Sequence, residues 1–270
     1  MITRRQFAKG SAVAITVLSG CSGDGAQQAP TGAPQVVEDD SQAVYVTDEY
    51  SAEAQVPEAA ATWTLPLGTV IFHGGGTYAA LMQRSETAAT PNTLGVLSLA
   101  SGTATTLLDT PTQGALFEFY DVRCTDSVFA WVEVNYSDRS WKLMAQPSDA
   151  QLSGGPVQLE EGTSDYDPPH FAVHGSSVIW QRMPSTSGGK TTEHSYCRMW
   201  TVGDSEGVQL WDSPGRFGSA PCVSGDILTI VPRVREDEGQ YYGMTAIDLA
   251  DEAHGQVDQL VLPQSVAPFT

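Results

Sequence analysis

From residue 68 onward, apolar residues alternate with polar ones in short runs, and Gly, Pro, Ser, Asp and Thr separate these runs. A period of two is typical of β-strands, and the separating residues are typical of tight turns. The spacing does not fit an amphipathic helix. We therefore predict an all-β body, with no more than a short helical turn near residues 48–61.

One strand pattern recurs four times along this body. The four copies read TYAALMQR, SVFAWVEV, SVIWQRM and DILTIVPRV, and they start at Thr77, Ser127, Ser177 and Asp226. These starts are 50, 50 and 49 residues apart. An inner strand precedes each copy, and two further strands follow it. The sequence therefore predicts four cycles of four strands.

Four strands at a period near 50 residues resemble the blades of a β-propeller, which are four-stranded sheets arranged around a channel. A β-sandwich or a β-solenoid is the alternative. Solenoid coils are shorter, however, and a sandwich does not need four cycles of one pattern. We therefore expect a β-propeller-type domain at residues 67–270, with about four blades.

The C-terminal residues 267–270 repeat the opening of a cycle, as residues 220–223 do. This repetition predicts the first strand of a fifth blade and hence an incomplete ring. We expect the chain to be an N-terminal fragment of a longer protein; the alternative is a gene that ends here. An interrupted ring would leave apolar sheet faces unpaired and prone to association.

The first twenty residues have the layout of an export signal. Positive charges come first, and the apolar run at residues 10–20 is too short to span a bilayer. The segment at residues 3–9, TRRQFAK, resembles the twin-arginine signal, whose recognised features are here Arg4, Arg5, Phe7 and Lys9. The resemblance implies export by the twin-arginine pathway.

The next motif, LSGC at residues 18–21, resembles a lipobox, in which the cysteine is lipidated and becomes the first residue of the mature protein. We therefore expect Cys21 to anchor the protein to the outward face of the cell membrane. Residues 21–43 are rich in Gly, Ala, Gln and Pro and predict a flexible tether. Residues 44–66 then connect this tether to the body.

The charge of the chain narrows the classes of partner. Its 270 residues include 13 basic and 32 acidic ones, for a formal charge of −19. Removing residues 1–20 takes away three basic residues and no acid, which leaves −22. Such a surface does not fit a nucleic-acid partner or direct binding to anionic lipid. Cys124, Cys197 and Cys222 form no CxxC motif, and we expect packed thiols; the alternative is a disulfide where neighbouring blades bring two of them together.

Two motifs resemble catalytic or phosphate-binding sequences. His73-Gly74-Gly75-Gly76 is similar to the oxyanion loop of lipase-type hydrolases, but the chain has no GxSxG nucleophile motif. We therefore interpret it as an inner strand. The segment GGKT at residues 188–191 resembles the end of a phosphate-binding loop, but Pro184 stands where the first glycine belongs. We predict a hairpin tip there.

In a propeller, the loops between blades and those between second and third strands lie on one face, and both kinds are long here. The densest polar group on these loops includes Asp165, Tyr166, Asp167 and His170, with Arg216 and Phe217 in the next cycle. Two acids and a histidine can hold a cation or transfer protons. The alternative is that the acids cap turns. These six residues are our candidate ligand site, with the question of a metal left open.

The signal and the repeats together resemble twin-arginine-exported lipoproteins with propellers, loosely of the TolB type. This resemblance implies a binding platform of the cell envelope, with an envelope protein or a glycan as ligand. No catalytic residue is carried over, and no cofactor motif is present, so we expect no cofactor. The alternative is an envelope enzyme that acts on glycans. Aromatic residues in the long loops, such as Tyr136 and Trp141, are suited to stacking on sugars or to closing blade edges.

Overall fold

The computed structural model describes residues 13–14, 36–37, 58–148, 155–235 and 241–263. Over these ranges the protein is all-β, as predicted, and residues 58–61 form no helix. None of the described segments is a helix long and apolar enough to cross a membrane. Arg4, Arg5, Phe7, Lys9 and Cys21, residues 48–57 of the predicted helical turn and the predicted fifth blade lie outside the described residues.

Four antiparallel sheets make up the body, and each follows one cycle of the predicted repeat. The first contains β3 (Thr69–Gly75), β4 (Tyr78–Gln83), β5 (Thr93–Ser98) and β6 (Ala104–Leu108). The second contains β7 (Glu118–Cys124), β8 (Val128–Asn135), β9 (Ser140–Pro147) and β10 (Val157–Gly162). The third contains β11 (His170–His174), β12 (Ser177–Arg182), β13 (Ser195–Thr201) and β14 (Val208–Ser213). The fourth contains β15 (Cys222–Ser224), β16 (Ile227–Ile230), β17 (Arg233–Arg235), β18 (Tyr241–Asp248) and β19 (Gln256–Pro263).

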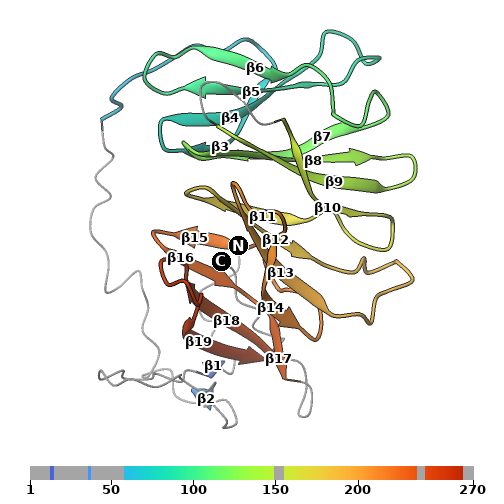
Figure 1. Cartoon of the computed structure of the whole chain (residues 1–270), viewed down its shortest axis with the longest axis vertical. Coiled ribbons are helices and arrows are strands. Elements are labelled where there is room, and N and C mark those ends of the chain that lie inside the picture. Colours follow the sequence, from blue (N-terminus) through green and yellow to red (C-terminus); the bar gives the residue numbers. More distant parts are fainter. Residues whose placement is uncertain (1–12, 15–35, 38–57, 149–154, 236–240, 264–270) are drawn as a thin grey trace, which may run out of the picture.

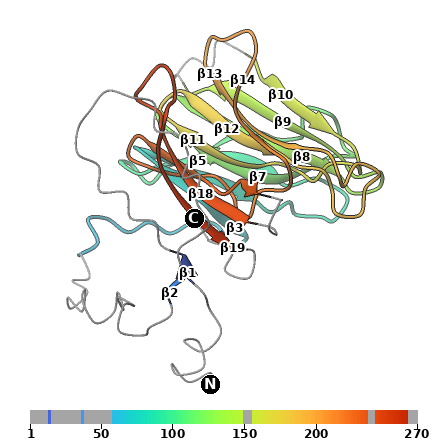
Figure 2. The same cartoon turned by 90° about the horizontal axis from the view of Figure 1, so that it is seen from below.

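The strands of the first three sheets are hydrogen-bonded in chain order, from an inner strand to an outer one. This is the topology of propeller blades. The sheets lie one on another in sequence, with the first and the fourth at opposite ends of the stack (Figure 1). Two short strands, β1 (Val13–Ala14) and β2 (Val36–Val37), pair with each other and belong to none of the four sheets (Figure 2).

The fourth sheet differs from the predicted four strands because its second strand is interrupted. β16 and β17 both pair with β18, and Val231 and Pro232 separate them. Proline has no backbone N–H to donate to a β-ladder. The carbonyl oxygen of Pro232 still accepts a 2.9 Å hydrogen bond from the Gly243 N–H. The sheet therefore keeps its place in the stack with five strands.

Apolar side chains fill the space between successive sheets. The alternation of β8 divides its side chains: Trp131 packs toward the first sheet, whereas Val132 and Val134 pack toward the third. Every residue of β8 is buried, because sheets cover both of its faces. A third cluster, which includes Ile179 and Leu228, joins the third sheet to the fourth. Burial of this surface is the main force that holds the sheets together.

The short turns between the first and second strands also join neighbouring sheets. The Thr125 hydroxyl donates a 2.5 Å hydrogen bond to the Gly175 carbonyl oxygen, from the second sheet to the third. His174 Nε2 lies 3.2 Å from Asp226 Oδ1, which joins the third sheet to the fourth. Gly175 has a φ of 53°, a value that glycine adopts without strain. Contacts between turns thus recur along the stack.

The outer face of the first sheet is covered by the segment that precedes it. Leu65 packs on Leu81 and Leu97, which point away from the second sheet. Trp63 lies against Gly102, where an added Cβ would come within 1.8 Å of the indole. One of the two sheet faces that an interrupted ring was expected to leave bare is therefore covered.

The cysteines follow the predicted packing only in part. Cys124 and Cys197 are buried free thiols, but Cys222 is exposed. Burial raises the pKa of Cys124 to about 11 and that of Cys197 to about 12. Cys222 lies on β15, whose side chains are mostly open to solvent. The expectation of a packed thiol was therefore wrong for Cys222.

Candidate functional site

The long loops gather along one side of the stack, on the right of Figure 1. They include residues 109–117 and 163–169, which join successive sheets, and residues 183–194, which join β12 to β13. We call this side the long-loop face and the opposite one the short-turn face. The division follows from the strand order, because alternate connections of an antiparallel blade emerge at opposite ends.

A pocket of about 510 Å³ opens on the long-loop face, between the second and third sheets. Its aromatic walls are Phe117, Trp141 and Tyr166. Its charged groups are Lys142, Glu160, Glu161 and Arg182, and its hydroxyl groups belong to Ser140 and Thr163. A concave site of this size with mixed aromatic and polar walls is suited to a small ligand or to part of a chain.

Trp141 and Tyr166 are joined to each other in the wall of the pocket. The Trp141 indole N–H donates a 2.9 Å hydrogen bond to the backbone oxygen of Tyr166. Gly162 allows this arrangement, because an added Cβ would lie 2.4 Å from the indole. The Arg182 guanidinium lies 4.2 Å from the centre of the Tyr166 ring, a cation–π contact. Side chains from both sheets therefore hold the pocket in shape.

The charged groups of the pocket are paired with one another. Glu160, with 9% of its side chain exposed, accepts hydrogen bonds from Arg182 at 3.3 Å and Arg198 at 3.2 Å. Lys142 Nζ donates to Gln158 Oε1 at 2.7 Å and lies 3.4 Å from Glu161 Oε2. The pocket is consequently close to electrically neutral, and its charged groups are held in ion pairs.

Asp165 is held by the loop that follows β12. Its Oδ1 accepts a 3.0 Å hydrogen bond from the Gly189 N–H, and its backbone oxygen accepts one from the Ser185 N–H. Gly188 packs against the Asp165 backbone, where an added Cβ would lie 2.8 Å from Cα. The predicted hairpin tip at residues 188–191 is confirmed, and its glycines serve this close contact.

Asp167 and Arg216 lie together, as their joint prediction implies. Arg216 Nη2 is 2.8 Å from Asp167 Oδ2, and Arg216 also donates to the Pro184 carbonyl oxygen. The arginine thus ties two loops of the third sheet to the connection that leads to the fourth. Phe217 lies apart from them, with 6% exposed, in the core between the third and fourth sheets.

His170 begins β11 and is exposed. Partial desolvation lowers its pKa below 6.5, and the Arg216 and Arg123 guanidiniums lower it further, against the opposing effect of Asp121 and Asp167. Its imidazole is therefore mostly neutral at pH 7. Of the six residues predicted as a ligand site, Tyr166 lines the pocket, while Asp165, Asp167 and Arg216 organise the loops beside it.

Sequence reasoning missed several residues that build the pocket, notably Phe117, Glu160 and Arg182. Two of them stand at or near the ends of strands that run to the long-loop face. Charged residues at such strand ends are the signal that could have identified them. Their neighbours across the gap between sheets could not be predicted from local patterns.

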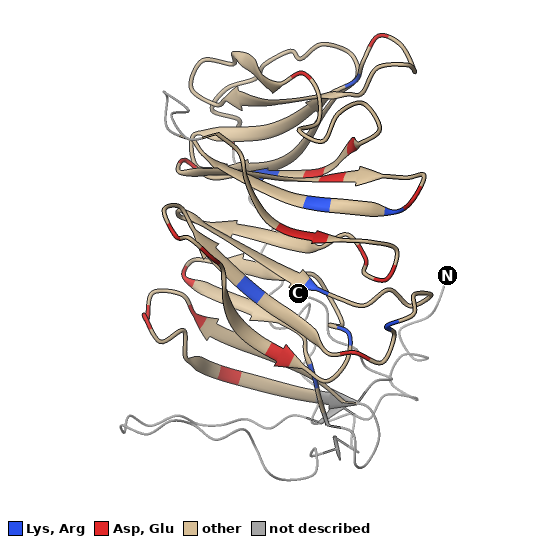
Figure 3. Cartoon of the chain, turned by 45° about the vertical axis from the view of Figure 1, so that its right-hand side comes forward, with Lys and Arg blue, Asp and Glu red and all other residues tan. Residues whose placement is uncertain are grey.

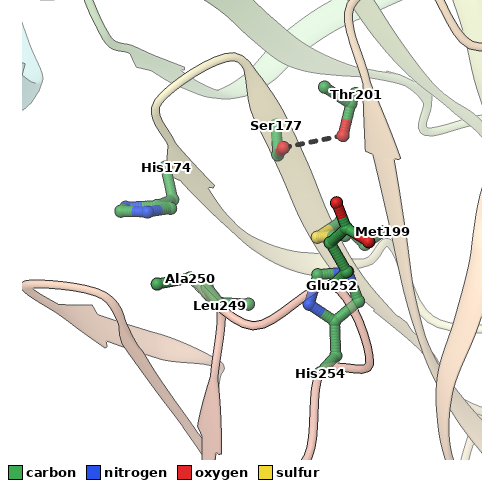
Figure 4. Close-up of a pocket in the computed structure, with 8 residues that line it drawn as sticks. All are labelled: His174, Ser177, Met199, Thr201, Leu249, Ala250, Glu252 and His254. Atoms are coloured by element: carbon green, nitrogen blue, oxygen red, sulfur yellow. Dashed lines mark hydrogen bonds between the residues drawn. The ribbon is translucent and has the colours of Figure 1, made fainter.

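A second pocket, of about 330 Å³, lies on the short-turn face between the third and fourth sheets. His174 and His254 line it from different sheets (Figure 4). The hydroxyl groups of Ser177 and Thr201 lie 2.8 Å apart in its wall. Among the residues that the structure describes, no group of three His, Cys, Asp or Glu side chains is placed to hold a metal ion.

Comparison with known proteins finds similar solved structures but no relative by sequence. No protein-family model matches the chain, and no curated protein sequence matches it. A solved structure from a study of two prolyl endopeptidases is 12% identical, with a TM-score of 0.50 over 72% of this chain and 29% of that one. The chain thus spans less than a third of that protein's length.

Two further structures share the arrangement more loosely. The β-propeller domain of the Trilobed protease from Pyrococcus furiosus, described as having an open velcro topology, is 10% identical, with a TM-score of 0.46 over 70% of this chain and 57% of that one. An acylaminoacyl peptidase from Pyrococcus horikoshii is 9% identical, with a TM-score of 0.44 over 67% and 31%. Likeness at this level of identity concerns the fold alone. The order of the strands in the four stacked sheets gives the chain a β-propeller-type fold.

Proposed function

We propose that the protein is a cell-envelope lipoprotein whose β-propeller-type body is a non-catalytic binding or scaffold module. The twin-arginine and lipobox motifs support export and attachment through Cys21. The pocket on the long-loop face supports the binding role. This pocket is the main observation in favour of binding, because two sheets form its walls and its charged groups are already paired.

The alternative is an envelope enzyme that acts on glycans with the acid pair of the third cycle. Asp165 accepts a hydrogen bond from a backbone N–H, and Asp167 pairs with Arg216. A pair of carboxyl groups that hydrolyses a glycoside needs one group that gives up a proton and one that attacks or activates water. The contacts of Asp165 and Asp167 favour a structural role instead.

Export and attachment to the membrane are tested by cell fractionation. Replacing Arg4 and Arg5 together with lysine should retain the precursor inside the cell. A Cys21→Ala variant should be exported but released from the membrane, whereas Ser22→Ala should remain attached. A Cys21→Ala protein that stays with the membrane in high salt would contradict lipid anchoring.

The binding role is tested with the exported protein as bait in solubilised envelopes, together with an assay of glycan hydrolysis. We expect a partner to be retained by the unaltered protein and lost when Tyr166 is replaced with Ala. Release of reducing sugar by the unaltered protein, abolished in Asp165→Asn and Asp167→Asn variants, would favour the enzyme instead.

A further inference from the structure

Exposed apolar and aromatic side chains lie in the segments next to the pocket residues Phe117 and Ser140. Leu116 is 76% exposed, Tyr120 48% and Tyr136 64%. Leu116 adjoins Phe117, which lines the pocket itself. Partial burial raises the pKa of Tyr136, and the nearby Tyr120 and Glu118 raise it further, which places these side chains together. Exposed patches of this kind mark binding surfaces.

The charge of the pocket differs from that of the chain as a whole. The chain has a formal charge of −19, whereas the charged residues that line the pocket are two bases, Lys142 and Arg182, and two acids, Glu160 and Glu161. Figure 3 shows basic and acidic residues interspersed in the second and third sheets. Lys190, whose Nζ lies 5.9 Å from the centre of the Tyr166 ring, pairs with Glu193 at 2.7 Å.

A neutral pocket on a strongly acidic protein limits the ligands that fit it. An anionic ligand would be repelled by the chain and would find the nearby cations already paired. A cationic ligand would be drawn to the acidic surface elsewhere rather than to this site. An uncharged ligand carries neither penalty, and it can exchange hydrogen bonds with paired side chains without separating them.

We propose that the pocket and the adjoining aromatic surface bind an uncharged oligosaccharide. The inference rests on the proposed binding role and names its ligand class. The C–H faces of sugar rings can pack on the exposed rings of Tyr120 and Tyr136. This contact buries apolar surface and needs no charge on the ligand. Sugar hydroxyl groups donate to Glu161 and accept from Lys142, whose side chains are both partly open to solvent. The hydroxyl groups of Ser140 and Thr163 in the lining offer further hydrogen bonds.

Binding is measured with the exported protein in detergent by titration with chitotetraose and maltotetraose, after a survey on an array of uncharged glycans. Tetragalacturonate and an uncharged peptide rich in Leu and Tyr serve as competitors. We expect at least one uncharged glycan to bind in preference to both competitors. Its affinity should fall at least tenfold in a Tyr120→Ala, Tyr136→Ala double variant.

Matched controls separate binding from folding. Val208→Ala and Val257→Ala remove exposed apolar side chains from other strands and should leave the affinity unchanged. A Tyr136→Phe variant keeps the ring and should retain most of the binding. Preference for the peptide or for tetragalacturonate would overturn the glycan inference while leaving the binding role intact. Absence of binding to every uncharged glycan would also overturn it, and retention of no envelope component would count against the binding role itself.

Discussion

Asp126 Oδ1 accepts two hydrogen bonds from Thr77, a residue 49 positions earlier: one from the backbone N–H at 2.7 Å and one from the hydroxyl at 2.8 Å. The contact joins the short turn of the first sheet to that of the second. Gly76 makes room for it, since an added Cβ would lie 2.3 Å from the Asp126 carboxylate. A single acceptor thus links neighbouring sheets almost one repeat apart.

This contact predicts a contribution to stability that depends on pH. The Thr77 N–H and hydroxyl hold the pKa of Asp126 below its ordinary value of 3.8. The contribution is therefore complete above that value and is lost as the pH falls through the lowered pKa. Thermal unfolding between pH 2 and 6 should show a smaller loss of stability on acidification for Asp126→Ala than for the unaltered protein. The exposed Glu206→Ala serves as the control, and identical curves for Asp126→Ala and the unaltered protein would refute the link.

Truncation of the Glu133 side chain should strongly lower the stability of the protein. Its carboxylate is fully buried, and it accepts hydrogen bonds from the Thr112 and Gln113 backbone N–H groups and from the Trp131 indole. Glu133→Ala leaves these donors without their acceptor and should lower the free energy of unfolding by about 3 kcal/mol. Denaturant titration measures the change. Glu133→Gln keeps one acceptor oxygen and should cost less; equal costs for the two variants would contradict this account.

Alanine substitutions at two adjacent glycines should have opposite effects on the stability of the protein. A Cβ on Gly75 would lie 2.0 Å from the Cys124 carbonyl oxygen, whereas a Cβ on Gly74 would meet nothing within 4 Å. Gly75→Ala must push β3 away from β7 and should destabilise the protein by about 3 kcal/mol. Gly74→Ala should be neutral or stabilise it by about 0.5 kcal/mol, because alanine loses less backbone entropy than glycine in a strand. Similar unfolding midpoints for the two variants would refute the close approach of the strands.

The three thiols of the body predict a simple reactivity pattern. The raised pKa values of Cys124 and Cys197, about 11 and about 12, leave almost no thiolate at neutral pH. A thiol reagent should therefore modify Cys222 in the folded protein and all three cysteines after unfolding. Mass spectrometry of the labelled peptides identifies the sites. Rapid labelling of Cys197 in the native state would show that the interface between the third and fourth sheets opens.

The repeat could be predicted from sequence because each strand carries its own alternation and each cycle repeats the same order. The interrupted strand of the fourth sheet was missed, since Pro232 stands within a run that is otherwise typical of a continuous strand. Sheets packed on both faces of β8 bury all of its residues, the polar Glu133 and Asn135 included. The neighbours of β8 then follow from the strand order.

The candidate site was less predictable because it depends on contacts between sheets. The sequence placed Tyr166 in a long loop, and the structure puts it in the wall of the pocket. Glu160 and Arg182 come together across a gap between sheets that no local pattern describes. Phe217 adjoins Arg216 in the chain, yet one side chain packs inward and the other pairs with Asp167. A loop residue's direction is set by the sheet it lies against, which is a property of the fold.

The cover that Trp63 and Leu65 provide for the first sheet has a consequence for closure of a ring. The apolar face around Leu81 and Leu97 is already covered by Leu65. Another sheet, from this chain or another, could pack on that face only by displacing this cover. A ring closed through the first sheet and a first sheet covered by Trp63 and Leu65 therefore exclude each other. The segment at residues 58–67 must therefore detach from the first sheet before another sheet can pack on that face.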